Sequence, residues 1–239
     1  MYADRVSAVH VGPKYMAVRL AGTGVGLSET AASPGAEGCL TSCVDRCSGA
    51  SAQEVLGLLG SHSLFERSVG LACANALANQ LRWPMSGGKE LNGGDGLEHV
   101  VAGLSDEVVL VGGLHQMTGP LRAEGAHVEV YGLHRDSMDE RMVEEAVAAL
   151  SKAEVAILAA TLLLDDSFDQ LIEACRACRQ VVVLGGSTPL VPHAFTGTPV
   201  TLLCGSIVRN VEAVMRVVSN AGGRKDLEPY LQKVSISLR

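Results

Sequence analysis

The sequence contains few aromatic residues, no excess of basic residues and no long apolar run. Aromatic residues make up 3% of its 239 residues, and 26 acidic residues outnumber 19 lysines and arginines, which gives a net charge of -7. Binding of nucleic acid needs clustered positive charge and stacking side chains, so we expect no nucleic-acid partner. The longest nearly apolar run, Val155 to Leu164, is shorter than the ~18 residues of a membrane span, so we expect no membrane-spanning helix.

Neither an export signal nor a disulfide framework is expected. The N-terminal segment MYADRVSAVHVG has no basic region followed by an apolar one, which favours a cytoplasmic protein. Seven cysteines, an odd number, then indicate free thiols. Cys39, Cys43 and Cys47 recur every four residues, so the three sulfurs share one face of a helix or of a strand. This trio is either a soft-metal site or a set of small buried side chains.

The N-terminal part of the chain predicts a β-hairpin followed by helices. Apolar residues alternate over residues 6–20 on either side of a Gly-Pro pair, which is typical of two strands joined by a tight turn. The glycine-rich segment that follows, residues 21–38, is expected to be a long loop or a weak strand. Helical periodicity from Leu64 to Leu81 predicts a helix. Asn75, in the middle of it, either hydrogen-bonds to a loop or faces a ligand.

The C-terminal part predicts a parallel sheet. Residues 83–101 are rich in glycine and mark a boundary between two domains, 1–85 and 86–239. Beyond this boundary short apolar strands alternate with helices, which indicates βαβ units and a doubly wound, Rossmann-like sheet. The apolar C-terminal segment VSISL is expected to be an edge strand through which a homodimer could form.

Three of these predicted strands end in residues that suit ligand binding, and open parallel sheets bind ligands at this edge. The first strand is followed by two adjacent glycines without the G-x-G-x-x-G fingerprint, which argues against a standard NAD enzyme. The second ends at Thr161, and the Asp165-Asp166 pair then opens a helix, where one aspartate can cap and the other can bind a cation. The third, in QVVVLGGSTPLVPHAF, is either a binding turn or an ordinary turn. The predicted metal ligands are His115, Asp165 and His193.

Five segments resemble the family described as putative heavy-metal chelation: GTGVGLSET, RSVGLACANAL, VVLVGGLHQMTGPLRAEGAHVEVYGL, TLLLDDSFDQL and VVLGGSTPLVPHAF. The resemblance runs nearly end to end and implies a small α+β enolase N-terminal-like domain, a Rossmann-like domain and a site in the cleft between them. The sequence departs from the family's pattern at residues 165–167, where Asn-Gly-Thr is typical, and at Gly186, where a proline is expected. Together, the resemblance and the strand ends give these ligand-binding residues: Asn75, Gly112, Gly113, Thr161, Gly185, Gly186, Ser187 and Thr188.

Two functions are compatible with these features. The first, which the resemblance largely supplies, is the binding or handling of a transition metal (nickel, copper, zinc or iron) or of a metal-chelating small molecule. The alternative is an enzyme that binds a nucleotide-type ligand such as S-adenosylmethionine in the Rossmann-like domain, with Asp165 or His115 as acid or base. A binding module without turnover is a third reading, so catalysis itself is left open.

Overall fold

The computed structural model describes residues 4–31, 37–80, 88–91, 96–132 and 139–239, and for residues 37–41 it describes the backbone only. The chain forms two compact units. The first contains residues 1–83 and 206–232, and the second contains residues 84–205 and 233–239. These units differ from the two consecutive segments expected from the sequence, because residues 206–232 belong with the N-terminal part. Among the described residues, no helix has the length and apolar character needed to cross a membrane.

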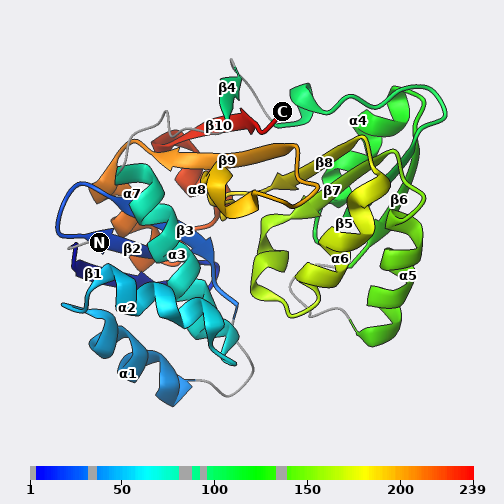
Figure 1. The fold of residues 1–239 in the computed structure, drawn as a ribbon. Helices are drawn as coiled ribbons and strands as arrows, with labels where there is room; N and C mark the ends of the chain where they lie inside the picture. Colours follow the sequence, from blue (N-terminus) through cyan, green and yellow to red (C-terminus); the bar gives the residue numbers. More distant parts are fainter. Residues whose placement is uncertain (1–3, 32–36, 81–87, 92–95, 133–138) are drawn as a thin grey trace. The chain divides into compact units, whose positions relative to one another are not determined.

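The first unit is built on a small antiparallel sheet with the order β1-β2-β3 (Figure 1). Its strands are β1 (Val6–Val11), β2 (Tyr15–Leu20) and β3 (Val25–Glu29). The amide of Gly12 donates to the carbonyl of Tyr15 at 2.8 Å and closes the turn between β1 and β2. The predicted hairpin is therefore confirmed, and part of the segment expected to be a long loop or a weak strand forms the third strand.

Helices cover both faces of this sheet. They are α1 (Glu37–Cys47), α2 (Ala52–Leu56), α3 (Leu64–Gln80), α7 (Val211–Ser219) and α8 (Arg224–Leu227). Val18 and Leu20 share a core with residues of α1, α2 and α3, whereas Ala17 and Val25 share a second core with α7 and α8. Successive side chains of a strand point to opposite faces, so β2 contributes to both cores. This second core is what attaches residues 206–232 to the first unit.

Glycine allows β3 and α3 to approach each other closely. A Cβ added to Gly26 would lie 2.1 Å from the backbone nitrogen of Ala76 and 2.2 Å from the carbonyl oxygen of Ala72. Real side chains cannot reach such distances, so this position requires glycine. Ala72 and Ala76 of α3 have small side chains and lie against this strand. The glycine-rich segment therefore serves helix packing at this point.

The second unit contains most of a seven-stranded sheet with the order β4-β10-β9-β8-β7-β5-β6. The strands are β4 (Lys89–Leu91), β5 (Glu107–Val111), β6 (His127–Tyr131), β7 (Val155–Ala159), β8 (Gln180–Leu184), β9 (Leu202–Val208) and β10 (Leu231–Ser237). Strands β6, β5, β7, β8 and β9 are parallel. Numbered from β5 along the chain, their spatial order is 2-1-3-4-5, which is a flavodoxin-like doubly wound order. The predicted α/β fold with a parallel sheet is confirmed.

The helices of the second unit connect consecutive parallel strands. They are α4 (Thr118–Ala123), α5 (Glu140–Leu150) and α6 (Phe168–Ala174). Helix α5 packs against β5 and against α6. The middle strands are apolar and buried along most of their length, and every residue of β7 is buried, as expected for a parallel sheet that is covered on both faces.

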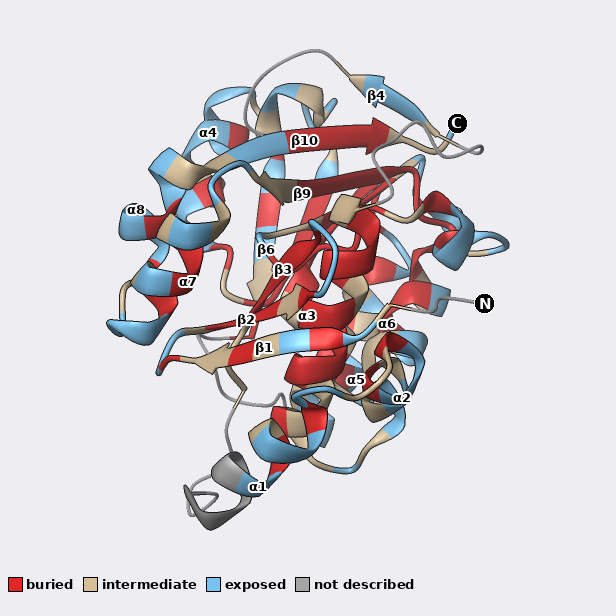
Figure 2. Ribbon diagram, turned by 90° about the vertical axis from the view of Figure 1, so that its left-hand side faces the viewer, coloured by how far each residue is buried: buried red, intermediate tan, exposed pale blue. Residues whose placement is uncertain are grey.

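The C-terminal strand β10 is not an edge strand. It lies between β9 and β4, and Ile236 pairs with Glu90 of β4 in antiparallel orientation. The second half of β10 is correspondingly buried, whereas Gln232 and Lys233 are exposed (Figure 2). The expected edge at VSISL is therefore wrong, because β4 covers it. A homodimer is still a prediction, but it can no longer be based on pairing through an exposed edge of β10.

Candidate ligand-binding site

The predicted strand-end residues meet at one edge of the seven-stranded sheet. Strands β8, β7 and β5 are neighbours and run parallel, so their carboxyl ends lie side by side (Figure 1). Gly112 follows β5, the 3-10 helix Ala160–Leu164 follows β7, and Gly185 follows β8. The chain leaves β5 toward β6 on one side and reaches β7 on the other side, which makes the β5–β7 gap the switch point of the sheet. Doubly wound sheets bind their ligands at this position.

Two of the predicted glycines are required by the geometry of this edge. Gly112 has φ +100° and Gly185 has φ +149°, and both values are unfavourable for residues with a side chain. A Cβ on Gly112 would lie 2.4 Å from the Cβ of Ala159, and one on Gly185 would lie 3.2 Å from the Cβ of Ala160. The turns after β5 and β8 therefore hold their backbones against the end of β7.

The other two predicted glycines are less constrained. Gly113 is half-buried and Gly186 is exposed. A Cβ on Gly186 would meet open space, and its φ lies outside the left-handed region. Glycine at position 186, where the family resemblance leads one to expect proline, is therefore not demanded by packing.

The hydroxyl of Thr188 is buried and lacks a hydrogen-bond partner in the part of the chain that the structure describes. The backbone amide of Thr188 donates to the carbonyl of Gly185 at 3.0 Å, which closes the turn after β8. Ser187 and Thr188 are each 2% exposed. Within the described part of the chain, the Thr188 Oγ1 atom makes no hydrogen bond. Leaving a buried hydroxyl unpaired costs about 1–3 kcal/mol, so such a group needs an explanation.

A second buried hydroxyl of interest, that of Ser167, lies in the loop that follows β7. The Oγ atom of Ser167 is buried and has no hydrogen-bond partner among the described residues. Asp165 shapes this loop, because its Oδ1 atom accepts the backbone amide of Ser167 at 2.8 Å. Thr161, half-buried in the 3-10 helix before the loop, lies next to the end of β7. The N-cap residue of α6 is Ser167, which makes no side-chain capping bond within the described chain, so the cap expected from the Asp165-Asp166 pair is not found and Asp165 forms a local turn before the helix.

The three predicted metal ligands do not form a metal site in this structure. His115 and His193 are exposed in separate 3-10 helices, His115–Met117 and Pro192–Phe195, whereas Asp165 is half-buried. Over the residues that the structure describes, no group of three or more His, Cys, Asp or Glu side chains is placed to hold a metal ion. The expected convergence of these side chains on one ion is therefore not found in the described part of the chain.

Asn75 has a structural contact in the first unit. It is 6% exposed on α3, and its Nδ2 atom donates to the carbonyl oxygen of Leu27 in β3 at 2.8 Å. One turn later, Asn79 donates to the carbonyl oxygen of Val25 at 2.6 Å. Both amides therefore join the helix to the strand beside it. Of the two alternatives for Asn75, the observed contact is a hydrogen bond to backbone.

The cysteine trio is helical in backbone, and two of its thiols are described. Cys43 and Cys47 on α1 are buried, and their sulfurs lie 4.0 Å apart. The side chain of Cys39 lies outside the described residues. Burial raises the pKa of the Cys43 thiol and raises that of Cys47 to about 12. Both thiols are therefore protonated at neutral pH in the folded protein.

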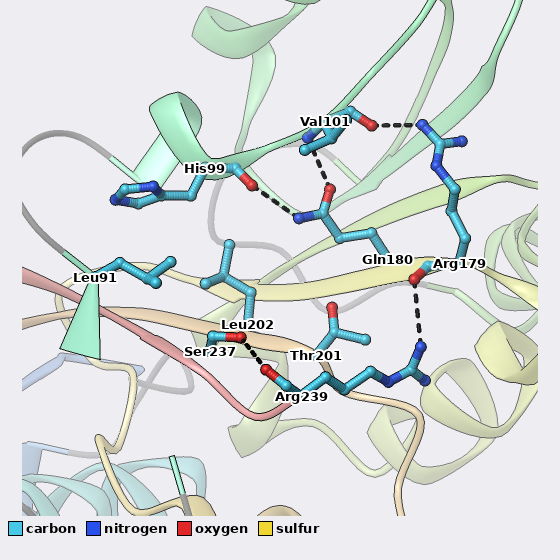
Figure 3. Close-up of a pocket in the computed structure, with 9 residues that line it drawn as sticks. All are labelled: Leu91, His99, Val101, Arg179, Gln180, Thr201, Leu202, Ser237 and Arg239. Carbon is cyan, nitrogen blue, oxygen red and sulfur yellow. Dashed lines mark hydrogen bonds between the residues drawn. The ribbon is translucent and has the colours of Figure 1, made fainter. Parts of the chain in front are cut away.

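A pocket that the sequence did not predict lies at the opposite, amino-terminal edge of the same sheet (Figure 3). Its volume is about 330 Å³. Gln180 spans the pocket wall, where its Nε2 atom donates to the carbonyl of His99 at 2.8 Å and its Oε1 atom accepts the amide of Val101 at 2.9 Å. The lining residues are Leu91, His99, Val101, Arg179, Gln180, Thr201, Leu202, Ser237 and Arg239.

The polar groups of this pocket mainly hold neighbouring segments together. Arg179 pairs with Asp106 at 2.7 Å, and this hydrogen-bonded guanidinium lowers the pKa of the Asp106 carboxyl. Thr201 accepts the amide of Val181 and donates to its carbonyl. None of the predicted site residues lines the pocket. The only signal in the sequence is a polar pair, Arg179-Gln180, directly before an apolar strand.

Comparisons with known proteins agree with this architecture. A crystal structure of a protein of unknown function from Desulfitobacterium hafniense, of the DUF364 family, superposes with a TM-score of 0.76 at 20% identity, over 99% of this chain and 93% of that chain. A second DUF364 protein of unknown function, from Pyrococcus horikoshii, gives a TM-score of 0.77 at 17% identity, over 98% and 94% of the two chains. At 20% and 17% sequence identity, the structural similarity shows that the chains share a fold and nothing further. None of the curated proteins is significantly similar to the chain.

Two family models match the sequence, and both carry the description "Putative heavy-metal chelation". DUF4213 matches residues 2–78 and DUF364 matches residues 95–237. Neither description points to S-adenosylmethionine, so the alternative ligand gains no support. The DUF364 match covers more than half of the sequence, and the chain therefore belongs to the DUF364 family.

Proposed function

We propose that the carboxyl edge of the seven-stranded sheet binds a small molecule that chelates a transition metal, with or without its metal. The observation that carries this proposal is the buried hydroxyl of Thr188, which lies in the close turn that begins at Gly185 and has no hydrogen-bond partner among the described residues. An oxygen or nitrogen atom of a bound molecule would supply the missing hydrogen bond. The description of the family as heavy-metal chelation supports the choice of ligand class.

A metal ion that is already bound to a chelator suits the carboxyl edge of the sheet, because few metal-binding side chains of the described residues follow its strands. A bare ion requires several protein ligands at once, whereas an ion already held by a chelator needs only one or two more. His115 and Asp165 follow the neighbouring strands β5 and β7, so either can supply such a ligand. Imidazole and carboxylate groups suit nickel, copper, zinc and iron. The interdomain position that the family resemblance implies stays a prediction.

The test compares free nickel ions with nickel citrate. Protein purified anaerobically and without an affinity tag is incubated with each form, desalted and assayed for bound metal by elemental analysis, and its melting temperature is measured in parallel. We expect nickel citrate to be retained near one ion per chain and to raise the melting temperature, because a ligand that binds only the native state stabilises it. Free nickel should be retained less.

Thr188→Val provides the decisive variant, because it removes the hydroxyl and keeps the shape. Its matched control is Thr201→Val, the same change at a buried threonine on the opposite edge of the sheet. We expect Thr188→Val to lose the chelate and Thr201→Val to retain it. Equal retention by both variants, or no retention of either nickel form by the unmodified protein, would contradict the proposal.

A further inference from the structure

The first unit contains a pair of buried thiols that the proposed function does not use. Cys43 and Cys47 lie one turn apart on α1, so their side chains point to the same face of the helix. They are 0% and 4% exposed, and their sulfurs lie 4.0 Å apart. Both belong to the core that α1, α2 and α3 form with one face of the small sheet.

The separation of the two sulfurs matches that of two thiolates on one metal ion. At metal–sulfur distances of about 2.3 Å, two sulfurs lie roughly 3.8 Å apart at a tetrahedral angle and roughly 4.6 Å apart in a linear arrangement. The observed 4.0 Å falls between these limits. The pair could therefore hold an ion with little movement of the helix backbone.

The residues around the Cys43 and Cys47 sulfurs favour a metal ion with a low coordination number. Cys73 of α3 is buried in the same core, but its thiol donates to the carbonyl of Ala52 at 3.7 Å. The other residues that this core contains, among the side chains that the structure describes, are hydrophobic and include Phe65 and Val69. Structural zinc is almost always held by four ligands, whereas soft thiolates select Cu(I). We propose that Cys43 and Cys47 bind one soft monovalent ion of the Cu(I) class as a pair of thiolates.

The charge of such a complex can be balanced by Arg46. Two thiols release two protons when they bind one monovalent ion, and the bis-thiolate complex carries one negative charge. Arg46 lies between the two cysteines in the sequence of α1, and its guanidinium pairs with Glu66 of α3. It therefore supplies a positive charge beside the pair. Because binding releases protons, the affinity should fall as the pH is lowered.

The first test uses Ag(I), which has the same charge and preference for sulfur as Cu(I) and does not change oxidation state. The full chain is titrated under argon in the presence of excess glutathione, desalted and assayed for silver. We expect one tightly held ion per chain and a thiolate-to-metal absorption band in the ultraviolet. Cys43→Ala with Cys47→Ala should lower the affinity at least about 100-fold, because one soft ligand pair is lost.

The matched control removes the same number of buried thiols from the second unit. Cys175 and Cys178 are also buried, and Cys175→Ala with Cys178→Ala should keep the bound silver. Circular dichroism establishes that each double variant is folded. Silver that remains in the Cys43/Cys47 variant, or that is lost equally from the Cys175/Cys178 variant, would overturn the proposal.

If Cys43→Ala with Cys47→Ala unfolds the protein, a second pair of variants tests the proposed metal site. Arg46→Gln removes the positive charge beside the thiols, whereas Glu66→Gln breaks the same ion pair and leaves that charge in place. Arg46 is largely exposed, with 64% of its side chain accessible, so folding should persist. We expect Arg46→Gln to weaken silver binding about tenfold and Glu66→Gln to leave it unchanged or to strengthen it, because the second change removes a negative charge near the thiolates. Equal effects of the two variants would overturn the role of Arg46 and, with it, the proposed site. These measurements do not depend on the strand-edge site, which nickel citrate probes separately.

Discussion

Gly112 meets Ala159 so closely that a Cβ on the glycine would lie 2.4 Å from the Cβ of the alanine. The contact joins the carboxyl ends of β5 and β7, where the parallel sheet reverses its strand order. It brings a glycine with φ +100° to the position at which doubly wound sheets bind ligands. The packing of the sheet and the shape of the proposed site therefore depend on the same residue.

Gly112→Ala should destabilise the second unit by about 2–5 kcal/mol, because the new Cβ combines overpacking with an unfavourable backbone conformation. Gly186→Ala serves as the control, since its Cβ would meet open space and its φ is unremarkable. That change should alter stability by less than about 1 kcal/mol. Differential scanning calorimetry of the two variants measures the contrast. Similar melting temperatures for both would show that the close contact is absent in solution.

Thr188→Val and Thr201→Val should affect the ligand-free protein in opposite ways. The Thr188 hydroxyl is buried without a partner among the described residues, so its removal should be neutral or stabilising by up to about 1 kcal/mol. The Thr201 hydroxyl bonds to both backbone groups of Val181, so its removal should cost about 1–3 kcal/mol. Urea unfolding followed by circular dichroism distinguishes the two. A large loss in Thr188→Val would mean that this hydroxyl already has a partner.

Gly26→Ala should be among the most damaging single changes in the first unit. The added methyl group would overlap the backbone of Ala72 and Ala76, and backbone atoms cannot move aside as a side chain can. We expect a loss of more than about 3 kcal/mol, or failure to fold. Gly57→Ala, where a Cβ meets nothing within 4 Å and the backbone is already helical, should instead be neutral or stabilising by about 0.5–1 kcal/mol. Comparing soluble yield and melting temperature of the two variants tests the prediction.

The Asp106–Arg179 pair should make stability depend on pH in the acidic range. The hydrogen bond from Arg179 lowers the pKa of Asp106 in the folded state, so the pair contributes fully above the ordinary carboxyl pKa of about 3.9. The contribution is lost as the pH falls through the lower, folded-state value. Asp106→Asn should therefore be less stable than the unmodified protein at pH 7, and the two should converge at the most acidic pH. Melting curves from pH 7 downward test this. Glu173→Gln, which breaks an exposed pair with Arg176, is expected to show a smaller difference.

Local sequence patterns determined the elements of this protein and the kind of sheet they form. Alternation around Gly12 predicted the first hairpin, and apolar runs separated by helical segments predicted the parallel strands. Ser51 and Glu54 have the spacing of a capping box at the start of α2, and both of its hydrogen bonds are present. These features depend on neighbouring residues, so the sequence displays them directly. Glycine pairs at strand ends likewise indicated the turns of the candidate site.

Contacts between distant segments decided what the sequence could not display. Nothing local in residues 206–232 shows that α7 buries Val214 and Val218 against the N-terminal sheet, because that core exists only once β2 and β3 have formed. For the same reason the apolar segment of β10 was predicted to be an edge strand, because its pairing with β4 could not be seen in the sequence.

Partners distant in sequence also set the chemistry of individual side chains. Asn75 bonds to the backbone of β3, and the Thr188 hydroxyl is left unpaired in the described structure, although both residues looked equally suited to a ligand in the sequence. The sequence by itself determined which segments become strands, helices and turns. Only the tertiary structure decided which polar groups of the described residues are hydrogen-bonded and which are buried without a partner, because hydrogen-bond partners and burial come from segments far apart along the chain.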